Sequence, residues 1–369
     1  MPAASVLEVR DLRVEYATAR GPVAAVDGAD LDVHEGEFVG LVGESACGKS
    51  TLLFAIAQLL SPPAEITGGS VLFRGQNLVT MTERQLQALR WQDYSVVMQS
   101  AMNALNPVMS VGAQFKDVLA AHTDMSGRRI TERSVEVLRL VGIDPIHLRS
   151  YPHQLSGGMR QRAMIAMALL FTPDLVIMDE PTSALDVVAQ RSLMVQIKQL
   201  QRRLGFAVVF VTHDMSLVSH FSDRLLVMYA GQVVEAGPTR TVFDAPAHPY
   251  SRGLLDAFPS IRGPRVPLTG IPGAPPDLAQ PPAGCRFHPR CPVAFADCSR
   301  VAPELYPVGD ARARCLLHAP ERAHTLHAVE GEEVRRDRAA GRGARADQAL
   351  QGRRGAVPDA PARGRRRVL

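Results

Sequence analysis

Residues 43–50 carry the strongest chemical signal in the sequence. They match the pattern G-x4-G-K-[ST], with Gly43 at the start and Gly48, Lys49 and Ser50 at the end. Backbone N–H groups of such a loop cradle phosphates, the lysine adds positive charge at the β- and γ-phosphates, and the hydroxyl can ligate Mg²⁺. The segment therefore predicts a nucleotide site. Cys47 is interpreted as a spacer residue of the loop, not as a metal ligand.

Asp179 and Glu180 are adjacent carboxylates that follow an apolar run, residues 175–178. Ligands of open parallel sheets bind at the carboxyl ends of strands. There, one carboxylate can hold Mg²⁺ and the next can polarise an attacking water. Taken alone, the pair fits a solvated turn equally well, because Asp-Glu-Pro also terminates strands. Together with the phosphate loop, it favours the second half of a nucleotide site.

Cys285, Cys291, Cys298 and Cys315 form a C-x5-C-x6-C-x16-C pattern near the end of the chain. Four thiolates suit an iron–sulfur cluster or structural zinc. The C-x2-C pair that is usual in zinc knuckles is missing, which favours iron–sulfur. Disulfides are not expected in a reducing compartment. The remaining alternative is that the cysteines are small apolar core residues.

Positioning these residues requires an α/β domain. Val- and Leu-rich strands are predicted at residues 7–16, 37–43, 95–98, 174–179, 206–212 and 224–229, and a helix at 49–60 follows the phosphate loop. Strands alternating with helical periodicity predict a mostly parallel central sheet. Residues 106–162 lack strand signals and are predicted to form a helical insertion.

The composition changes after Leu255. Residues 259–284 are rich in Pro and Gly, which is typical of a linker or a small irregular domain. Residues 334–369 contain eleven arginines and three aspartates, which is a net charge of +8. Because the whole chain has a net charge of +4, the rest of it carries −4. We expect the Arg-rich tail, residues 331–369, to be disordered. A mildly acidic body argues against a nucleic-acid partner.

The chain is predicted to be cytoplasmic. No run approaches the ~18 apolar residues needed to span a bilayer. The N-terminal residues lack the charged-then-apolar leader of a signal peptide. Any link to a membrane must then come through partner subunits.

The segment Leu155–Arg162 reads Leu-Ser-Gly-Gly-Met-Arg-Gln-Arg and lies between the phosphate loop and the carboxylate pair. It resembles the LSGGQ signature of ABC ATPases, which other phosphate-loop ATPases lack. Further residues follow in that family's order, although each has a structural explanation when taken singly. Tyr16 matches the aromatic that stacks on adenine, Gln99 the Q-loop glutamine, Asp186 the D-loop aspartate and His213 the switch histidine.

The resemblance covers roughly residues 5–320 and implies a fold. We expect a RecA-like phosphate-loop core with an antiparallel N-terminal sheet and a helical signature subdomain. The ATPase domain would span residues 5–257, with its helical part at 106–162. A small irregular extension would follow at 258–322.

The resemblance also implies a mechanism in which two ATPase domains sandwich two ATP molecules. Glu180 would be the general base, with His213, Gln99 and Lys49 as further catalytic residues, and Ser50, Gln99 and Asp179 would hold Mg²⁺. Nucleotide contacts within the chain would come from Tyr16, Gly43, Ser45, Cys47, Gly48, Lys49, Ser50, Thr51, Gln99 and Asp179. In trans they would come from Ser156, Gly157, Gly158 and Asp186.

Several segments resemble the dipeptide and oligopeptide importers within this family. They are Met159 in the signature, residues 105–107, 248–250 and 271–273, and the cysteine block. In that branch this cysteine set carries a [4Fe–4S] cluster. The implied partners are two transmembrane permease subunits, a sister ATPase subunit and, indirectly, an extracytoplasmic substrate-binding protein. The chain would then lie at the cytoplasmic face of the membrane.

The chain departs from the family pattern at two places. Ala46 replaces a glycine of the phosphate loop, and if the position needs a positive φ, its Cβ would cost about 1 kcal/mol. Ser100-Ala101 replaces the usual Asp-Pro near the expected permease surface.

Oligosaccharides and nickel are therefore alternative cargoes. A soluble ABC ATPase acting on DNA or ribosomes, and a degenerate regulatory cassette, are the alternatives outside transport.

Overall fold

The computed structural model describes residues 4–99, 104–183, 185–257 and 270–320. Most of these belong to one compact unit, Met1–Leu316, and the second unit, Leu317–Leu369, contributes only residues 317–320. Ser100-Ala101, part of the predicted extension and the whole predicted tail 331–369 lie outside the described residues.

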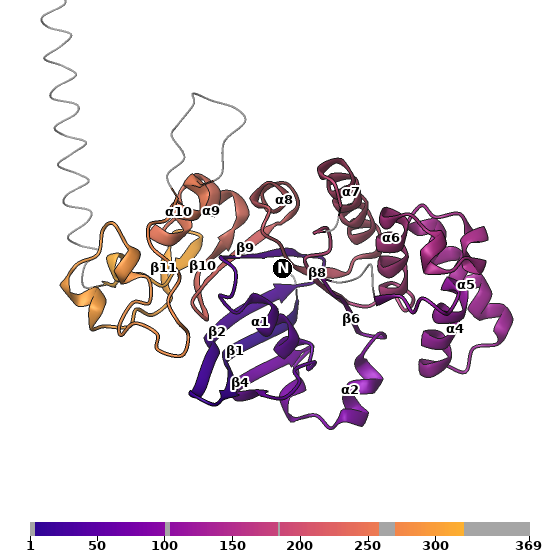
Figure 1. Cartoon of the computed structure of the whole chain (residues 1–369), viewed down its shortest axis with the longest axis horizontal. Helices are drawn as coiled ribbons and strands as arrows, with labels where there is room; N and C mark the ends of the chain where they lie inside the picture. Colours follow the sequence, from indigo (N-terminus) through magenta and orange to yellow (C-terminus); the bar gives the residue numbers. More distant parts are fainter. Residues whose placement is uncertain (1–3, 100–103, 184, 258–269, 321–369) are drawn as a thin grey trace, which may run out of the picture. The chain divides into compact units, whose positions relative to one another are not determined.

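Strands and helices alternate along the chain, as predicted for an α/β protein (Figure 1). The strands are β1 Ser5–Thr18, β2 Gly21–His34, β3 Phe38–Val42, β4 Ala64–Phe73, β5 Gln76–Asn77, β6 Tyr94–Val97, β7 Leu175–Asp179, β8 Ala207–Val211, β9 Arg224–Tyr229, β10 Gln232–Pro238, β11 Tyr306–Val308 and β12 Ala311–Ala313. The helices are α1 Lys49–Ile56, α2 Glu83–Leu89, α4 Val111–His122, α5 Gly127–Leu140, α6 Gly157–Ala168, α7 Val187–Leu204, α8 Met215–Phe221, α9 Thr239–Asp244 and α10 Pro249–Asp256.

The strands form two sheets. The first has the order β2-β1-β4-β5, and all its pairings are antiparallel. This confirms the expected antiparallel N-terminal sheet. The second has the order β11-β12-β10-β9-β3-β8-β7-β6, in which β9, β3, β8, β7 and β6 are parallel. The predicted parallel core is therefore present.

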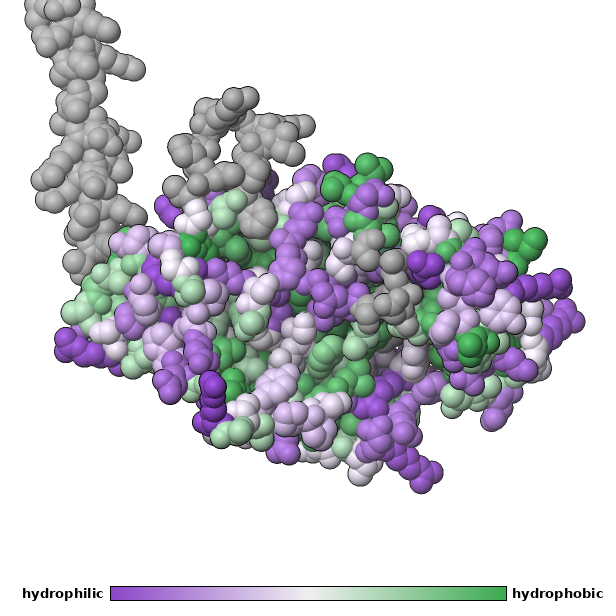
Figure 2. Space-filling view, viewed as in Figure 1, coloured by the Kyte–Doolittle hydropathy of each residue, from purple (hydrophilic) through white to green (hydrophobic). Residues whose placement is uncertain are grey.

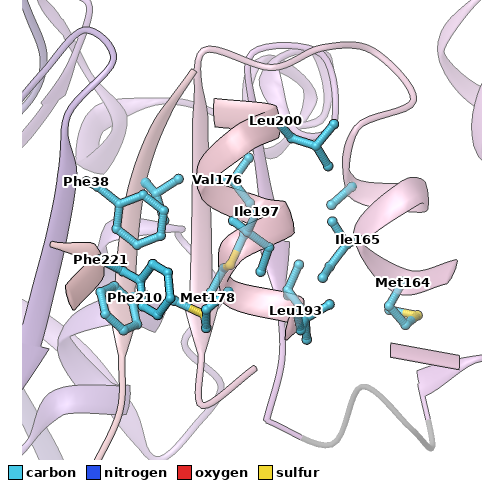
Figure 3. Packing of buried hydrophobic residues seen from close by; sticks show 14 of the residues in the cluster. Phe38, Met164, Ile165, Val176, Met178, Leu193, Ile197, Leu200, Phe210 and Phe221 are labelled. Carbon is cyan, nitrogen blue, oxygen red and sulfur yellow. The ribbon is translucent and has the colours of Figure 1, made fainter. Parts of the chain in front are cut away.

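Alternate residues of the parallel strands face two different cores. In β3, Phe38 and Val42 belong to one buried cluster, whereas Val39 and Leu41 belong to the other. The first cluster packs the sheet against α6 and α7, with Phe210 and Ile197 among its members (Figure 3). Every residue of β3, β7 and β8 is buried, as expected for parallel strands covered on both faces.

The segment predicted as a helical insertion contains α4, α5 and the start of α6. α4 packs against α5, and α5 packs against α6. The helix after the phosphate loop is shorter than predicted, because α1 ends at Ile56 and Gln58 has a positive φ of 53°. A residue in this left-handed conformation does not continue a helix.

The C-terminal extension is less irregular than expected. Strands β11 and β12 form a hairpin, and β12 pairs with β10, which extends the main sheet. No helix among the described residues is both long enough and apolar enough to cross a membrane.

Candidate functional site

The phosphate loop lies between the end of β3 and the start of α1, at the carboxyl edge of the parallel sheet. Gly43 has φ of 154° and Gly48 has φ of 105°. A Cβ on Gly43 would lie 2.1 Å from the Met228 carbonyl oxygen, and one on Gly48 would lie 2.1 Å from that of Ala25. Both positions therefore require glycine, because neighbouring backbone approaches too closely for any side chain.

Lys49 directs its ammonium group back into the loop. Its Nζ donates to the carbonyl oxygens of Gly43 at 2.9 Å and of Glu44 at 2.8 Å. It also lies 3.7 Å from Cys47 Sγ. The positive charge is thereby fixed beside the N-terminus of α1, where backbone N–H groups also favour an anion.

Ala46 has a φ of 61°, in the left-handed region. The positive φ that would make alanine unfavourable here is therefore present: this position takes a conformation that glycine adopts freely and alanine does not. The strain costs about 1 kcal/mol.

Asp179 is buried, 3% exposed, at the end of β7. Burial raises the pKa of its carboxyl group, while a hydrogen bond from Ser50 and the charge of Lys49 lower it. Its Oδ1 atom has no hydrogen-bond partner in the described part of the chain. A buried, unpartnered carboxylate oxygen next to a hydroxyl is a donor set that fits Mg²⁺. Ser50 and Asp179 would therefore hold the ion.

Glu180 lies at the centre of a polar cluster. Its Oε1 is 2.5 Å from Nε2 of His213, and its Oε2 accepts a hydrogen bond of 2.6 Å from Nε2 of Gln99. The three residues follow β7, β8 and β6, which are neighbours in the sheet. Glu180 itself has a φ of 46°, a strained conformation of the kind found at functional sites. The structure thus brings together three residues predicted to be catalytic.

Tyr16 and Thr51 also meet. The Tyr16 hydroxyl lies 3.2 Å from Thr51 Oγ1, so the end of β1 contacts the first turn of α1. Ser45 lies inside the loop and Cys47 is buried beneath it. These positions are compatible with the nucleotide contacts predicted for them.

The residues predicted to act in trans start helices elsewhere in the domain. The hydroxyl of Ser156 accepts from Met159 N–H and caps α6, with Gly157 and Gly158 in its first turn. Asp186 caps α7 by accepting from Ala189 N–H at 2.9 Å. The buried Gln161 of α6 donates to the carbonyl oxygen of Pro181, which joins the signature helix to the segment after Glu180.

Three residues at this site were not predicted from the sequence to act there. Glu44, inside the loop, forms an ion pair with Arg290 of the C-terminal extension, and its backbone N–H donates to the Tyr250 hydroxyl at 2.8 Å. Tyr250 and Arg290 lie in segments that resemble the importer branch, but nothing local in either segment points to the phosphate loop.

The predicted [4Fe–4S] or zinc site is not supported by this arrangement. Cys298 and Cys315 are buried, and Cys285 and Cys291 are partly buried. Burial raises the pKa of the thiols of Cys285 and Cys291, which also pack against the hydrophobic core. Among the described residues, no group of three or more His, Cys, Asp or Glu side chains is arranged to hold a metal ion.

The fold and this site define a phosphate-loop ATPase. A family model described as "ABC transporter" matches residues 26–183, and one described as "Oligopeptide/dipeptide transporter, C-terminal region" matches residues 234–298. The chain belongs to the ATP-binding proteins of ABC transporters, in the branch that carries the oligopeptide/dipeptide C-terminal region. It is accordingly an ATP-hydrolysing subunit.

Curated relatives match over most of their length. The dipeptide transport ATP-binding protein DppD of Caldanaerobacter subterraneus is 42% identical, over 85% of this chain and 97% of the relative. The oligopeptide transport ATP-binding protein OppD of Salmonella typhimurium is 44% identical, over 85% of this chain and 94% of the relative.

Among solved structures, the dimeric bacterial ABC transporter cassette MJ0796 is similar. It has a TM-score of 0.57 and 28% sequence identity, and the match covers 63% of this chain and 99% of that one. The cassette cbiO1 of Clostridium perfringens matches with a TM-score of 0.56 and 28% identity, over 65% of this chain and 91% of that one.

Proposed function

We propose that this chain drives the import of di- or oligopeptides. It would bind two transmembrane permease subunits at the cytoplasmic face of the membrane, and only through them would it be linked to an extracytoplasmic substrate-binding protein. The names of the relatives and the match to the oligopeptide/dipeptide region support this cargo class. The observation that carries the enzymatic part is the contact of Glu180 with His213 and Gln99, beside Asp179.

In the proposed reaction, the phosphate loop and Lys49 hold the β- and γ-phosphates of ATP. Ser50 and Asp179, with Gln99 nearby, would hold Mg²⁺, which would supply positive charge beside the phosphates. Glu180 accepts a proton from the attacking water. Tyr16 contributes the stacking surface for adenine. The hydrogen bonds that Gln99 and His213 make to Glu180 would exchange for contacts with the γ-phosphate and the water.

The second half of each site would come from a partner ATPase subunit. Ser156, Gly157 and Gly158 at the N-terminus of α6 suit a phosphate, since their N–H groups are free of helical partners. Next to Asp186, Val187 and Val188 are 77% and 80% exposed, and Figure 2 shows hydrophobic surface over α7. Exposed apolar side chains beside a candidate trans residue favour an interface there. The dimeric MJ0796 cassette supports the same arrangement.

A [4Fe–4S] cluster in the extension is a separate part of this proposal, and it rests on resemblance and spacing alone. No step above passes through it. The test is iron and acid-labile sulfide analysis of anaerobically purified protein, with Cys285→Ser as the comparison. About four irons per chain, lost in the variant, would require the extension to rearrange around the cluster. Zinc or no metal would remove it.

The cargo is tested in proteoliposomes that contain the chain with its permease, its sister ATPase and its binding protein. We expect ATP-dependent accumulation of labelled di- or oligopeptides, and no accumulation with Glu180→Gln. Labelled oligosaccharide and Ni²⁺ serve as competing cargoes. Uptake of either without peptide uptake would overturn the cargo class but leave the ATPase standing.

A further inference from the structure

The C-terminal extension holds the phosphate loop directly through Arg290. Its two terminal nitrogens donate to the two carboxylate oxygens of Glu44, at 2.7 and 2.9 Å. This is a bidentate ion pair, the strongest geometry available to an arginine. The Arg290 side chain is 6% exposed and that of Glu44 is 24% exposed, so solvent screens the pair little.

Arg290 is also held by one group of the extension and by one group of strand β9. Its Nε donates to the Pro272 carbonyl oxygen at 2.8 Å, and its Nη1 lies 3.3 Å from the Tyr229 hydroxyl. Because each donor has a partner, the guanidinium has little freedom to turn away from Glu44. The hydrogen bond to Glu44 raises the pKa of Arg290 above its already high value, so the charge is permanent.

An aromatic cluster anchors the same place. Tyr229, Tyr250 and Phe287 have ring centroids 4.5 to 5.4 Å apart, and Phe287 comes from the extension. Tyr250 accepts the N–H of Glu44, so the cluster reaches the loop through its backbone. The loop is therefore held at Glu44 by both its side chain and its main chain.

The contact continues to the phosphate-binding lysine. The Glu44 carbonyl oxygen accepts a hydrogen bond of 2.8 Å from Lys49 Nζ. A chain of contacts thus runs from Arg290 through Glu44 to Lys49. If Arg290 is lost, a partly buried carboxylate remains unpaired beside the place where phosphates bind, and the carbonyl that orients Lys49 is released.

We propose that Arg290 is a positioning residue of the nucleotide site, through which the C-terminal extension sets the shape and charge of the phosphate loop. The proposal rests on the nucleotide site described above. Arg290 touches no reacting atom, so it acts on nucleotide affinity and not on the chemical step. The extension then contributes to the ATP site and is not only an appendage of the ATPase domain.

The test compares full-length variants in the assembled transporter. Arg290→Ala should raise the Kd of a fluorescent ATP analogue with Mg²⁺, and the KM for ATP, by about tenfold while kcat changes by less than about twofold. Arg290→Lys keeps the charge but loses the bidentate fork, so it should recover part of the affinity. In a double variant with Glu44→Gln, the two effects should be strongly non-additive.

The matched control is Arg224→Ala. Arg224 pairs with Glu37 at 3.4 Å, just before β3, at the opposite end of that strand from the phosphate loop. It should lower the unfolding temperature without moving the KM for ATP. An unchanged Kd in Arg290→Ala, or equal effects of Arg290→Ala and Arg224→Ala on KM, would overturn the proposal.

The experiment also distinguishes a variant that does not fold, and a failure of the nucleotide site itself, from a failure of the role given to Arg290. If Arg290→Ala does not fold, Arg290→Lys and Glu44→Gln carry the test, and ATP affinities equal to wild type in both would overturn it. If the wild-type protein binds no ATP, the nucleotide site itself is wrong. If Lys49→Ala abolishes binding and Arg290→Ala leaves it intact, only the role of Arg290 fails.

Discussion

Glu180 and His213 are in direct contact, with 2.5 Å between Oε1 and Nε2. The contact follows from topology, because β7 and β8 are parallel neighbours whose carboxyl ends lie at the same edge of the sheet. Gln99 joins them because β6 is the next parallel strand. Three side chains that are far apart in the sequence therefore meet over one stretch of sheet edge.

Replacing Glu180 tests the proposed general base. Glu180→Gln keeps the side-chain shape and one hydrogen-bond acceptor, but it cannot take a proton at neutral pH. We expect ATP hydrolysis by the assembled transporter to fall by about 10²–10³-fold with ATP binding retained. Hydrolysis within about threefold of wild type would show that another group activates the water.

The strained alanine of the phosphate loop gives a second prediction. Ala46 has a φ of 61°, so Ala46→Gly should raise the free energy of unfolding by up to about 1 kcal/mol. Urea denaturation measures this. The matched control is Ala120→Gly on the exposed face of α4, which should lose about 1 kcal/mol. If both variants lose stability, the strain at Ala46 is relieved in solution.

Asp179 links stability to pH. Burial raises its folded-state pKa above that of the unfolded chain, so the charged carboxylate destabilises the fold at neutral pH. This destabilisation is fully present above the raised pKa and disappears as the pH falls below the unfolded value. Asp179→Asn should therefore stabilise the nucleotide-free protein by about 1 kcal/mol at pH 7, and the gain should shrink toward acidic pH.

The same variant should lose its response to the ligand. Mg²⁺ with ATP raises the unfolding temperature of the wild-type protein by binding only the folded state. Asp179→Asn should show much less of this rise, because one magnesium ligand is gone. A variant that is less stable at pH 7, or that keeps the full Mg²⁺-dependent rise, would contradict the role given to Asp179.

Gly48 tests the steric requirement of the loop. A Cβ there would lie 2.1 Å from the Ala25 backbone oxygen, so Gly48→Ala must displace the loop. We expect a loss of about 2 kcal/mol in stability and at least about a tenfold loss in ATP affinity. Gly127→Ala is the control, because its Cβ would meet open space at the start of α5. Its stability should stay within about 0.5 kcal/mol of wild type.

The local parts of the molecule were predictable from the sequence. The strands of the parallel sheet, the phosphate loop before α1 and the carboxylates after β7 all appear where apolar runs and motif residues place them. These features depend on neighbours along the chain, which a pattern reports directly. The roles of Gln99 and His213 were assigned from the family resemblance. Both residues and Glu180 follow strands of one parallel sheet, and this topology brings the three together.

What only the tertiary structure decided is which distant segments meet. Glu44 and Arg290 are 246 residues apart, and no periodicity or motif connects them. Strand β12 joins β10, and the clustered cysteines pack as thiols without converging on a metal-binding group within the described residues. Sequence patterns record the conformation of each segment. The contacts between segments depend on how buried surfaces and charges fit together in three dimensions. The contact between Arg290 and Glu44, which joins the extension to the nucleotide site, is of this kind.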